Sequence, residues 1–319
     1  RVDALAARAA NKCDDPDSQK RCVDALAYVA LPALWESYRG CEGPCELHSV
    51  AANASLRGLA MHVRSFLATQ SLNTSLTLWV DNVPNVRNLL SGSVGKCHSP
   101  QAVSWRHRVR VRPLFEVPDA DVGVQVTYAT TDLLRMRILR AFGGIFVDLD
   151  TVLLGDLAPL CGASFAYRWS SMDKYNNAVF GCPQGCEFAR RFSERAGADE
   201  KVYYPLNWPE DILGTTYPTK LPSRLFDPNW IANDGKDGTK PAKYLFRSFD
   251  DFDRKSTPVL KLFQKADEPL PFHEAFPGSL VYHWHAGRLP AKQTNQRTVA
   301  AQLEKALATK LGCHDHHDQ

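Results

Sequence analysis

One stretch, residues 127–160, constrains the fold of this chain more than any other. Within it Leu134, Ile138 and Phe142 recur every four residues, which predicts an amphipathic helix over Asp132–Phe142 with one buried face. A short apolar segment follows this helix almost at once. A helix joined so closely to a strand-like segment indicates an α/β fold.

Residues with strong local preferences mark the ends of this helix. Thr130 or Thr131 is expected to cap its start. Gly143 and Gly144 are expected to end it, because glycine readily adopts the left-handed conformation found after helices. The next residues, Ile145–Val147, are apolar and partly β-branched, so we predict a buried strand of the sheet.

Two aspartates, Asp148 and Asp150, follow the predicted strand. Ligands in open α/β sheets bind outside the carboxyl ends of the strands, and residues two apart on a strand point the same way. The pair can therefore present two hard oxygen ligands to one divalent cation. Asp132 and Arg135 share a face of the preceding helix, so packing of that helix beside the strand would bring an acid and a base near the same metal.

This pattern, T-D-x-x-R, an apolar helix and then G-G-I-x-x-D-x-D, resembles the sugar-binding core of retaining glycosyltransferases of the GT-A type. It is most similar to the DXD-containing enzymes with the α-1,4-glycosyltransferase and α-1,6-mannosyltransferase signature, a group like glycosyltransferase family 32. It is also similar to the large clostridial glucosylating toxins. A D-x-D alone would be weak evidence, and the spacing of the other residues makes the signal specific. The matching residues are Thr131, Asp132, Arg135, Gly143, Gly144, Ile145, Asp148 and Asp150.

The resemblance implies a GT-A (Rossmann-like) nucleotide-sugar-binding fold, with a mainly parallel twisted sheet and flanking helices. It implies transfer of a hexose, with retention, from a nucleotide diphosphate sugar to a hydroxyl of a glycan or glycoconjugate. A UDP-sugar is expected in preference to GDP-mannose. Mn2+ or Mg2+ would be held by Asp150 and Asp148, and would neutralise the leaving diphosphate. Asp132 and Arg135 would hold sugar or ribose hydroxyls.

Residues outside the central stretch also match the family. Asn177, and with less support Asn176, would lie beside the donor sugar, since an amide can both donate to and accept from hydroxyls. His283 matches the position of a histidine that completes a metal or pyrophosphate site, with His285 as the second choice. Lys292 and either Arg297 or Arg288 are further candidates for contacts with the diphosphate.

Residues 199–247 are rich in Trp, Tyr, Pro and Asp. Aromatic rings beside carboxylates suit a carbohydrate acceptor, because the C–H face of a sugar stacks on rings while its hydroxyls bond acids. An irregular, proline-stiffened loop region with aromatic packing explains the same composition. Both interpretations stay open at the level of sequence.

Two rival functions share the same residues. Phe146–Thr151 also fits the apolar-D-x-D-x-T motif of haloacid-dehalogenase-like phosphatases, with Asp148 as nucleophile and Asp150 as acid/base. In that family, however, the motif lies on the first strand of the domain, and here a long segment with its own helix and strand patterns comes before it. The second rival is a catalytically silent sugar-binding protein on the same fold.

Composition and net charge narrow the class of protein further. The 319 residues are 44% hydrophobic and 23% charged, which is ordinary for a globular catalytic domain. The net charge of +3 does not favour a nucleic-acid partner. Runs of about 18 apolar residues are absent, so the sequence predicts neither a membrane span nor a signal peptide. Because the chain begins at Arg1, we expect a piece of a longer, single-pass type II protein of the Golgi lumen, anchored by a preceding segment.

Nine cysteines favour disulfides in an oxidising compartment, with one left over. Several cysteines lie close together in the sequence: Cys13 and Cys22, Cys41 and Cys45, and Cys182 and Cys186. A zinc site built from the two C-x3-C pairs is the alternative. Glycosylation sequons at Asn53 and Asn73 add to the argument for an oxidising compartment.

The predicted organisation is a disulfide-tied N-terminal extension over 1–45, a catalytic domain over 46–312 and a tail over 313–319. Periodicity predicts helices at Cys45–Gln70 and Glu187–Gly197, and a helix followed by a loop over Val86–Ser99. It predicts strands at Leu76–Val80, Val109–Phe115, Ser164–Trp169 and Tyr175–Gly181, and a strand running into a loop over Gly278–Gly287.

Overall fold

The computed structural model describes residues 44–52, 56–119, 128–168, 175–196, 218–221, 223–227, 279–283 and 299–313. Its centre is a seven-stranded sheet with the strand order β3-β2-β1-β4-β7-β6-β8. These strands are β1 (Cys45–Ala51), β2 (Thr74–Val80), β3 (Val109–Pro113), β4 (Gly144–Val147), β6 (Phe165–Arg168), β7 (Tyr175–Cys182) and β8 (Thr219–Leu221). A separate antiparallel pair consists of β5 (Thr151–Leu153) and β9 (Val281–His283).

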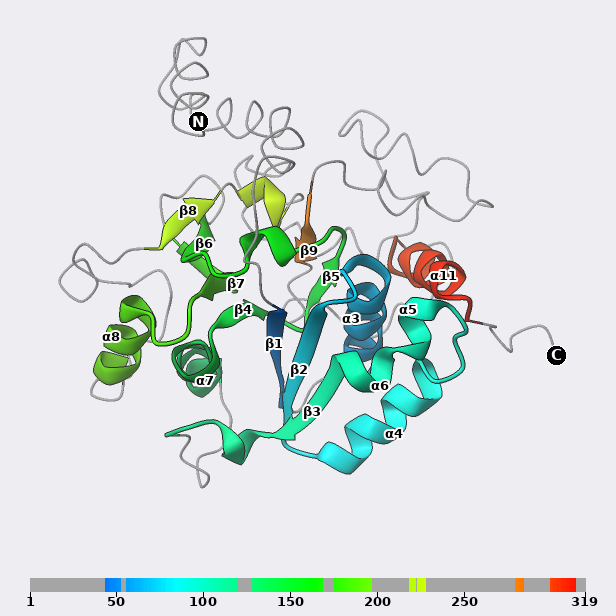
Figure 1. Ribbon diagram of the computed structural model, residues 1–319, viewed down its shortest axis with the longest axis horizontal. Helices are drawn as coiled ribbons and strands as arrows, with labels where there is room; N and C mark the ends of the chain where they lie inside the picture. The colour runs from blue at the N-terminus through cyan, green and yellow to red at the C-terminus, as the bar shows by residue number, and fades with distance from the viewer. Residues whose placement is uncertain are drawn as a thin grey trace, which may run out of the picture.

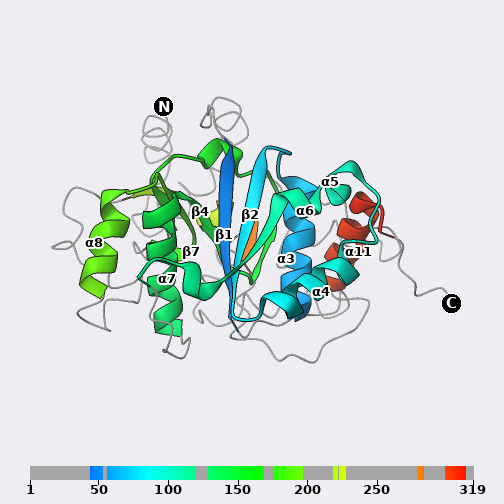
Figure 2. The same ribbon diagram turned by 60° about the horizontal axis from the view of Figure 1, so that its bottom comes forward.

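Helices cover both faces of the sheet (Figures 1 and 2). The longer ones are α3 (Leu56–Thr69), α4 (Val83–Ser93), α7 (Tyr128–Phe142), α8 (Glu187–Ala196) and α11 (Val299–Leu311). Short turns of helix are α5 (Pro100–Val103), α6 (Trp105–Arg108), η1 (Leu114–Glu116), η2 (Ala158–Leu160) and η5 (Ser223–Leu225). Helices α7 and α8 pack together on one face, and α11 packs on α3 on the other.

Alternation along the central strands divides the apolar side chains between two cores. In β4, Ile145 and Val147 join the core under α3 and α11, and Phe146 joins the core under α7 and α8. Because both faces are covered, β4 is apolar throughout, which is the pattern of a central strand of a parallel sheet in an α/β protein. The predicted α/β fold, with a mainly parallel sheet and helices on both faces, is confirmed.

The order of the parallel strands reverses between β1 and β4. From β1 the chain builds outward through β2 to β3, and then returns to the other side of β1 to form β4. In open α/β sheets such a reversal leaves a crevice outside the carboxyl ends of the two strands, where ligands bind. Strand β4 ends at Val147, so the D-x-D motif lies at this point of the sheet.

The helix predicted over Cys45–Gln70 is wrong in its first half. Cys45–Ala51 forms β1, which pairs with β2 on one side and β4 on the other, and the helix begins only at Leu56. The sequence did not indicate this central strand, because it contains the polar residues His48 and Ser49. Polar residues in a buried strand need hydrogen-bond partners, and here the tertiary structure supplies them.

Helix α7 also begins earlier than predicted, at Tyr128, so Thr130 and Thr131 lie inside it and do not cap its start. Packing of α7 against α8 and the sheet stabilises helical turns that the apolar repeat alone did not indicate. Its end agrees with the prediction, since Gly143 and Gly144 follow Phe142 with φ of 68° and 88°.

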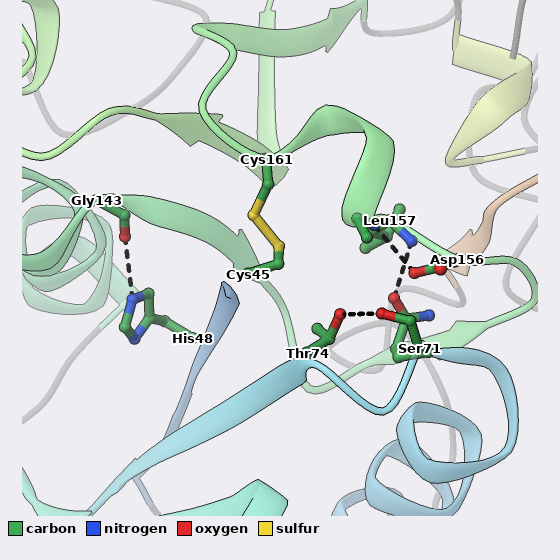
Figure 3. The surroundings of a disulfide bond; sticks show 10 residues. Cys45, His48, Ser71, Thr74, Gly143, Asp156, Leu157 and Cys161 are labelled. Carbon is green, nitrogen blue, oxygen red and sulfur yellow. Dashed lines mark hydrogen bonds between the residues drawn. A yellow bond between two sulfur atoms is a disulfide. The ribbon is translucent and has the colours of Figure 1, made fainter. Parts of the chain in front are cut away.

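Three disulfides lie within the described residues: Cys45–Cys161, Cys97–Cys313 and Cys182–Cys186. Figure 3 shows the first, which joins the start of β1 to the segment after η2. The pairing of Cys182 with Cys186 is confirmed, whereas Cys45 bonds Cys161 and is therefore not available to Cys41. A zinc site on the C-x3-C pairs is excluded, because three of its four sulfurs are in disulfides.

The described elements include no helix that is both long and apolar enough to cross a membrane. The division at 1–45, 46–312 and 313–319 stays a prediction. Cys45 already belongs to β1, and Cys313 is bonded to Cys97.

Candidate metal centre

The two aspartates of the D-x-D motif follow β4, as predicted, and lie in a tight turn between β4 and β5. The backbone N–H of Asp148 still donates to the carbonyl of Ala178 at 2.7 Å, which ties the turn to β7. Asp150 leads directly into β5, where Thr151 pairs with His283 of β9. That pairing brings Nε2 of His283 to 3.2 Å from Oδ1 of Asp150.

Asp148, Asp150 and His283 form a cluster suited to a cation. One ligand atom from each lies within 4.8 Å of the other two. The side chains of Asp148 and Asp150 are 19% and 22% exposed, so a ligand can reach them from solvent. Two carboxylate oxygens and one imidazole nitrogen are a donor set that fits Mn2+, or Mg2+ with retained water ligands.

Arg135 of α7 is the positive centre beside this cluster. Its Nη2 lies 2.9 Å from Oδ1 of Asp148, and its Nη1 lies 3.3 Å from Oδ1 of Asp132. Nη1 also donates to the backbone carbonyl of Asn177 at 3.0 Å, and the guanidinium carbon lies 5.2 Å from the ring centroid of Phe146. The structure thus brings together the predicted acid, base and D-x-D motif.

Asn177 reaches the same group of side chains from β7. Its Nδ2 donates to Oδ1 of Asp132 at 2.8 Å. The register between β6 and β7 shifts beside this residue, since Ala166 pairs with Phe180 but Tyr167 pairs with Asn176. Asn176 instead uses Oδ1 to accept from the N–H of Ala178, so of the two neighbouring amides only Asn177 belongs to the site.

Charge in the site is unbalanced toward the carboxylates. Burial raises the pKa of Asp148 to about 7, with a further rise from Asp150 and an opposing effect of Arg135. Burial also raises the pKa of Asp132, against the influence of Arg135 and Asn177. For Arg135 burial lowers the pKa, but Asp148 and Asp132 outweigh it and the net change is upward. A bound cation would offset the excess negative charge.

Sequence reasoning missed Tyr167, whose hydroxyl lies 3.0 Å from Nδ1 of His283. Asp227 places Oδ2 4.0 Å from the same nitrogen. Tyr167 belongs to a correctly predicted strand, yet nothing in its local pattern set it apart. Burial, with a further contribution from Asp227, raises the pKa of the Tyr167 hydroxyl, so it keeps its proton at neutral pH.

A buried polar network holds the turn from the side of α3. The ring nitrogens of His62 lie 3.0 Å from Oγ of Ser49 and 3.1 Å from the carbonyl of Thr151. Ser49 donates to the carbonyl of Val147 at 2.7 Å, and the Thr151 hydroxyl donates to the carbonyl of Asp148 at 2.6 Å. Backbone oxygens on both sides of the D-x-D motif are therefore fixed. Burial lowers the pKa of His62 to about 4, so its ring is neutral.

Several predicted residues lie outside the described part of the chain. They are His285, Lys292, Arg297 and Arg288. Most of the aromatic region at 199–247 is also outside it, and only 218–221 and 223–227 are described.

No family model and no curated protein matches the chain. Among solved structures, the glycosyltransferase GlyE of Streptococcus pneumoniae TIGR4 aligns with 14% identity and a TM-score of 0.45, over 86% of this chain and 61% of GlyE. The galactosyltransferase LgtC, in complex with donor and acceptor sugar analogues, aligns with 14% identity and a TM-score of 0.46, over 85% of this chain and 98% of LgtC.

The PaToxG glycosyltransferase aligns with 10% identity and a TM-score of 0.36, over 61% of this chain and 75% of PaToxG. This chain thus spans about three fifths of the length of GlyE. Similarities at this level assign neither an activity nor a substrate.

Proposed function

We propose that the chain is a metal-dependent glycosyltransferase of the GT-A type. It would transfer a hexose, with retention, from a nucleotide diphosphate sugar to a hydroxyl of a glycan or glycoconjugate, and prefer a UDP-sugar to GDP-mannose. The observation that supports this most strongly is the convergence of Asp148, Asp150 and His283 where the strand order reverses. The resemblance of the T-D-x-x-R and G-G-I-x-x-D-x-D pattern to that family adds independent support.

The crevice outside β1 and β4 is where a nucleotide would bind in such a sheet. Asp148, Asp150 and His283 would hold Mn2+ or Mg2+ at its edge. The bound cation would supply Lewis-acid stabilisation of the leaving diphosphate. Arg135 adds a fixed positive charge, and its three oxygen partners hold it in place before any substrate binds, so little reorganisation is needed.

Asp132 and Asn177 would orient the donor sugar. Arg135 and Asn177 both contact Oδ1 of Asp132, which leaves Oδ2 for a sugar hydroxyl. Each of the three carboxylates of the site already has a role, Asp148 and Asp150 as ligands of the cation and Asp132 as a partner of Arg135 and the sugar. We infer that none of them acts as a nucleophile and that the acceptor hydroxyl attacks from the leaving-group side.

The same contacts argue against the phosphatase alternative. A nucleophilic Asp148 would have to be ionised and free to attack, yet its Oδ1 lies 2.9 Å from Nη2 of Arg135. In addition, the motif follows β4 in the middle of the sheet, and not the first strand of the chain.

We further propose that the protein acts in the Golgi lumen as the luminal part of a type II membrane protein. The three disulfides of the described region support an oxidising compartment. The sequons at Asn53 and Asn73 agree with this location.

Calorimetric titration of UDP- and GDP-sugars, with and without Mn2+, tests the proposal. The wild type should bind one nucleotide sugar only when Mn2+ is present, and Asp150→Asn should lose that binding. Asp119→Asn is the matched control, because this carboxylate is exposed and its contact with Arg140 is long, at 3.9 Å. Slow hydrolysis of the bound donor, followed by NMR, would show retention if the sugar is first released in the anomeric configuration of the donor.

Each result separates the candidate functions. Binding of a glycan without any nucleotide sugar would favour the silent sugar-binding protein. Release of phosphate from a phosphomonoester, lost in Asp148→Asn, would favour the phosphatase. Absence of nucleotide binding under every metal condition would refute the transferase.

A further inference from the structure

We propose that Tyr167 is a positioning residue for the metal site. Its hydroxyl, together with the carboxylate of Asp227, holds the ring of His283 so that Nε2 faces the D-x-D turn. This inference rests on the proposed function, because it concerns a ligand of the proposed cation. It adds a role for two side chains that do not themselves join the Asp148, Asp150 and His283 cluster.

The two nitrogens of His283 have different surroundings. Nδ1 lies 3.0 Å from the hydroxyl oxygen of Tyr167 and 4.0 Å from Oδ2 of Asp227. Nε2 lies 3.2 Å from Oδ1 of Asp150. These three contacts are with oxygens, and the one on the Nε2 side belongs to the metal cluster. The geometry assigns Nε2 as the ligand atom and Nδ1 as the anchored atom.

Binding of a cation at Nε2 needs a lone pair there, so the ring proton must be on Nδ1. A proton on Nδ1 needs a hydrogen-bond acceptor, and the hydroxyl oxygen of Tyr167 is placed to accept it. Because Tyr167 is 0% exposed, water could not take the place of this hydroxyl. The carboxylate of Asp227 on the same side favours a proton on Nδ1 electrostatically. Ligating histidines in metal sites are commonly oriented by such a hydrogen bond from the second nitrogen.

The fold brings Tyr167, Asp227 and His283 together from three separate segments, β6, the residues just after η5, and β9. Tyr167 is on β6, where it pairs with Asn176 of β7 and Leu221 of β8. Its ring centroid lies 5.3 Å from that of Phe226, the residue before Asp227.

Two backbone hydrogen bonds complete the arrangement. The N–H of His283 donates to the carbonyl of Phe226 at 3.2 Å, and the N–H of Asp227 donates to the carbonyl of Ser223 at 2.7 Å. Residue His283 is thus held by a backbone hydrogen bond, and its ring is held by the contact at Nδ1.

The test is calorimetric titration of Mn2+ alone into the wild type, Tyr167→Phe and Asp227→Asn. Tyr167→Phe keeps the aromatic ring and removes only the hydroxyl. Tyr175→Phe is the matched control, since Tyr175 lies on β7, the strand beside β6, and its hydroxyl donates to the carbonyl of Pro218 at 3.1 Å. We expect Tyr167→Phe to weaken Mn2+ binding about tenfold or more, Asp227→Asn to weaken it in the same direction, and Tyr175→Phe to leave it unchanged.

Thermal unfolding without metal separates positioning from a general structural role. Tyr167→Phe should unfold at a lower temperature than Tyr175→Phe, because it removes a fully buried hydrogen bond, but both variants should be folded at the temperature of the titration, so that the difference in Mn2+ affinity reports on positioning. If Tyr167→Phe binds Mn2+ as tightly as the wild type, the positioning role is wrong while the transferase proposal stands. If Tyr167→Phe does not fold, unchanged Mn2+ binding by Asp227→Asn overturns the inference. If the wild type itself binds no Mn2+, the proposed metal site and this inference fail together.

Discussion

Replacing His48 with glutamine should make the stability of the protein less sensitive to acid. His48 is fully buried on β1, where its Nε2 donates to the carbonyl of Gly143 at 3.0 Å (Figure 3). Its Nδ1 accepts a long hydrogen bond, 3.4 Å, from Nε1 of Trp79. The neutral ring satisfies both contacts, whereas a proton on Nδ1 would face the indole N–H. Burial lowers the pKa of His48 to about 4, despite the opposing effect of Glu46.

The sign and size of the effect follow from that shift. Between pH 6.5 and pH 4 the unfolded chain binds a proton at His48 that the folded protein does not, so stability falls as the pH falls through this window. Integrating between pH 7 and pH 5 gives a loss of about 2 kcal/mol from this residue. His62 has a similarly lowered pKa and Asp148 a raised one, but both are the same in wild type and variant and cancel in the comparison.

The measurement is urea unfolding of the wild type and His48→Gln at pH 7 and pH 5. The difference in the free energy of unfolding between the two pH values should be about 2 kcal/mol smaller in the variant. His107→Gln is the control, because His107 is exposed and its replacement should leave the difference unchanged. Equal pH dependence in wild type and His48→Gln would refute the argument from burial.

Two further pairs of variants test the backbone and the disulfides. Gly144→Ala should cost about 3 kcal/mol or more in urea unfolding, because φ is 88° and a Cβ would overlap the carbonyl oxygen of Glu46. Gly185→Ala, at φ of 70° with open space around the Cβ, should cost only about 1 kcal/mol, and equal costs would contradict the overlap argument. Removing Cys45–Cys161, with a sequence separation of 116, should cost about 5 kcal/mol, against about 2 kcal/mol for Cys182–Cys186 with a separation of 4. The same unfolding assay on the two double Cys→Ala variants checks this ranking, and a reversed order would contradict the loop-entropy argument.

The central part of the fold could be predicted from the sequence because its signals are local. The apolar repeat of α7, the glycines that end it and the apolar residues of β4 act over a few residues and depend on backbone preference and helical period. The position of Asp148 and Asp150 after a buried strand follows from the same segment. The local pattern also placed Asp132 and Arg135 on one face of the helix, and the structure shows them in contact.

Only the tertiary structure decided which distant residues meet. The pairing of β5 with β9 brings His283 to Asp150, and no periodicity in either segment encodes that register. For His283 the sequence offered only a family resemblance. The strand β1, the partner of Cys45 and the contact of Tyr167 with His283 were missed for a common physical reason. Each depends on long-range packing that supplies a buried polar or sulfur group with its partner, and local propensity carries no information about such partners.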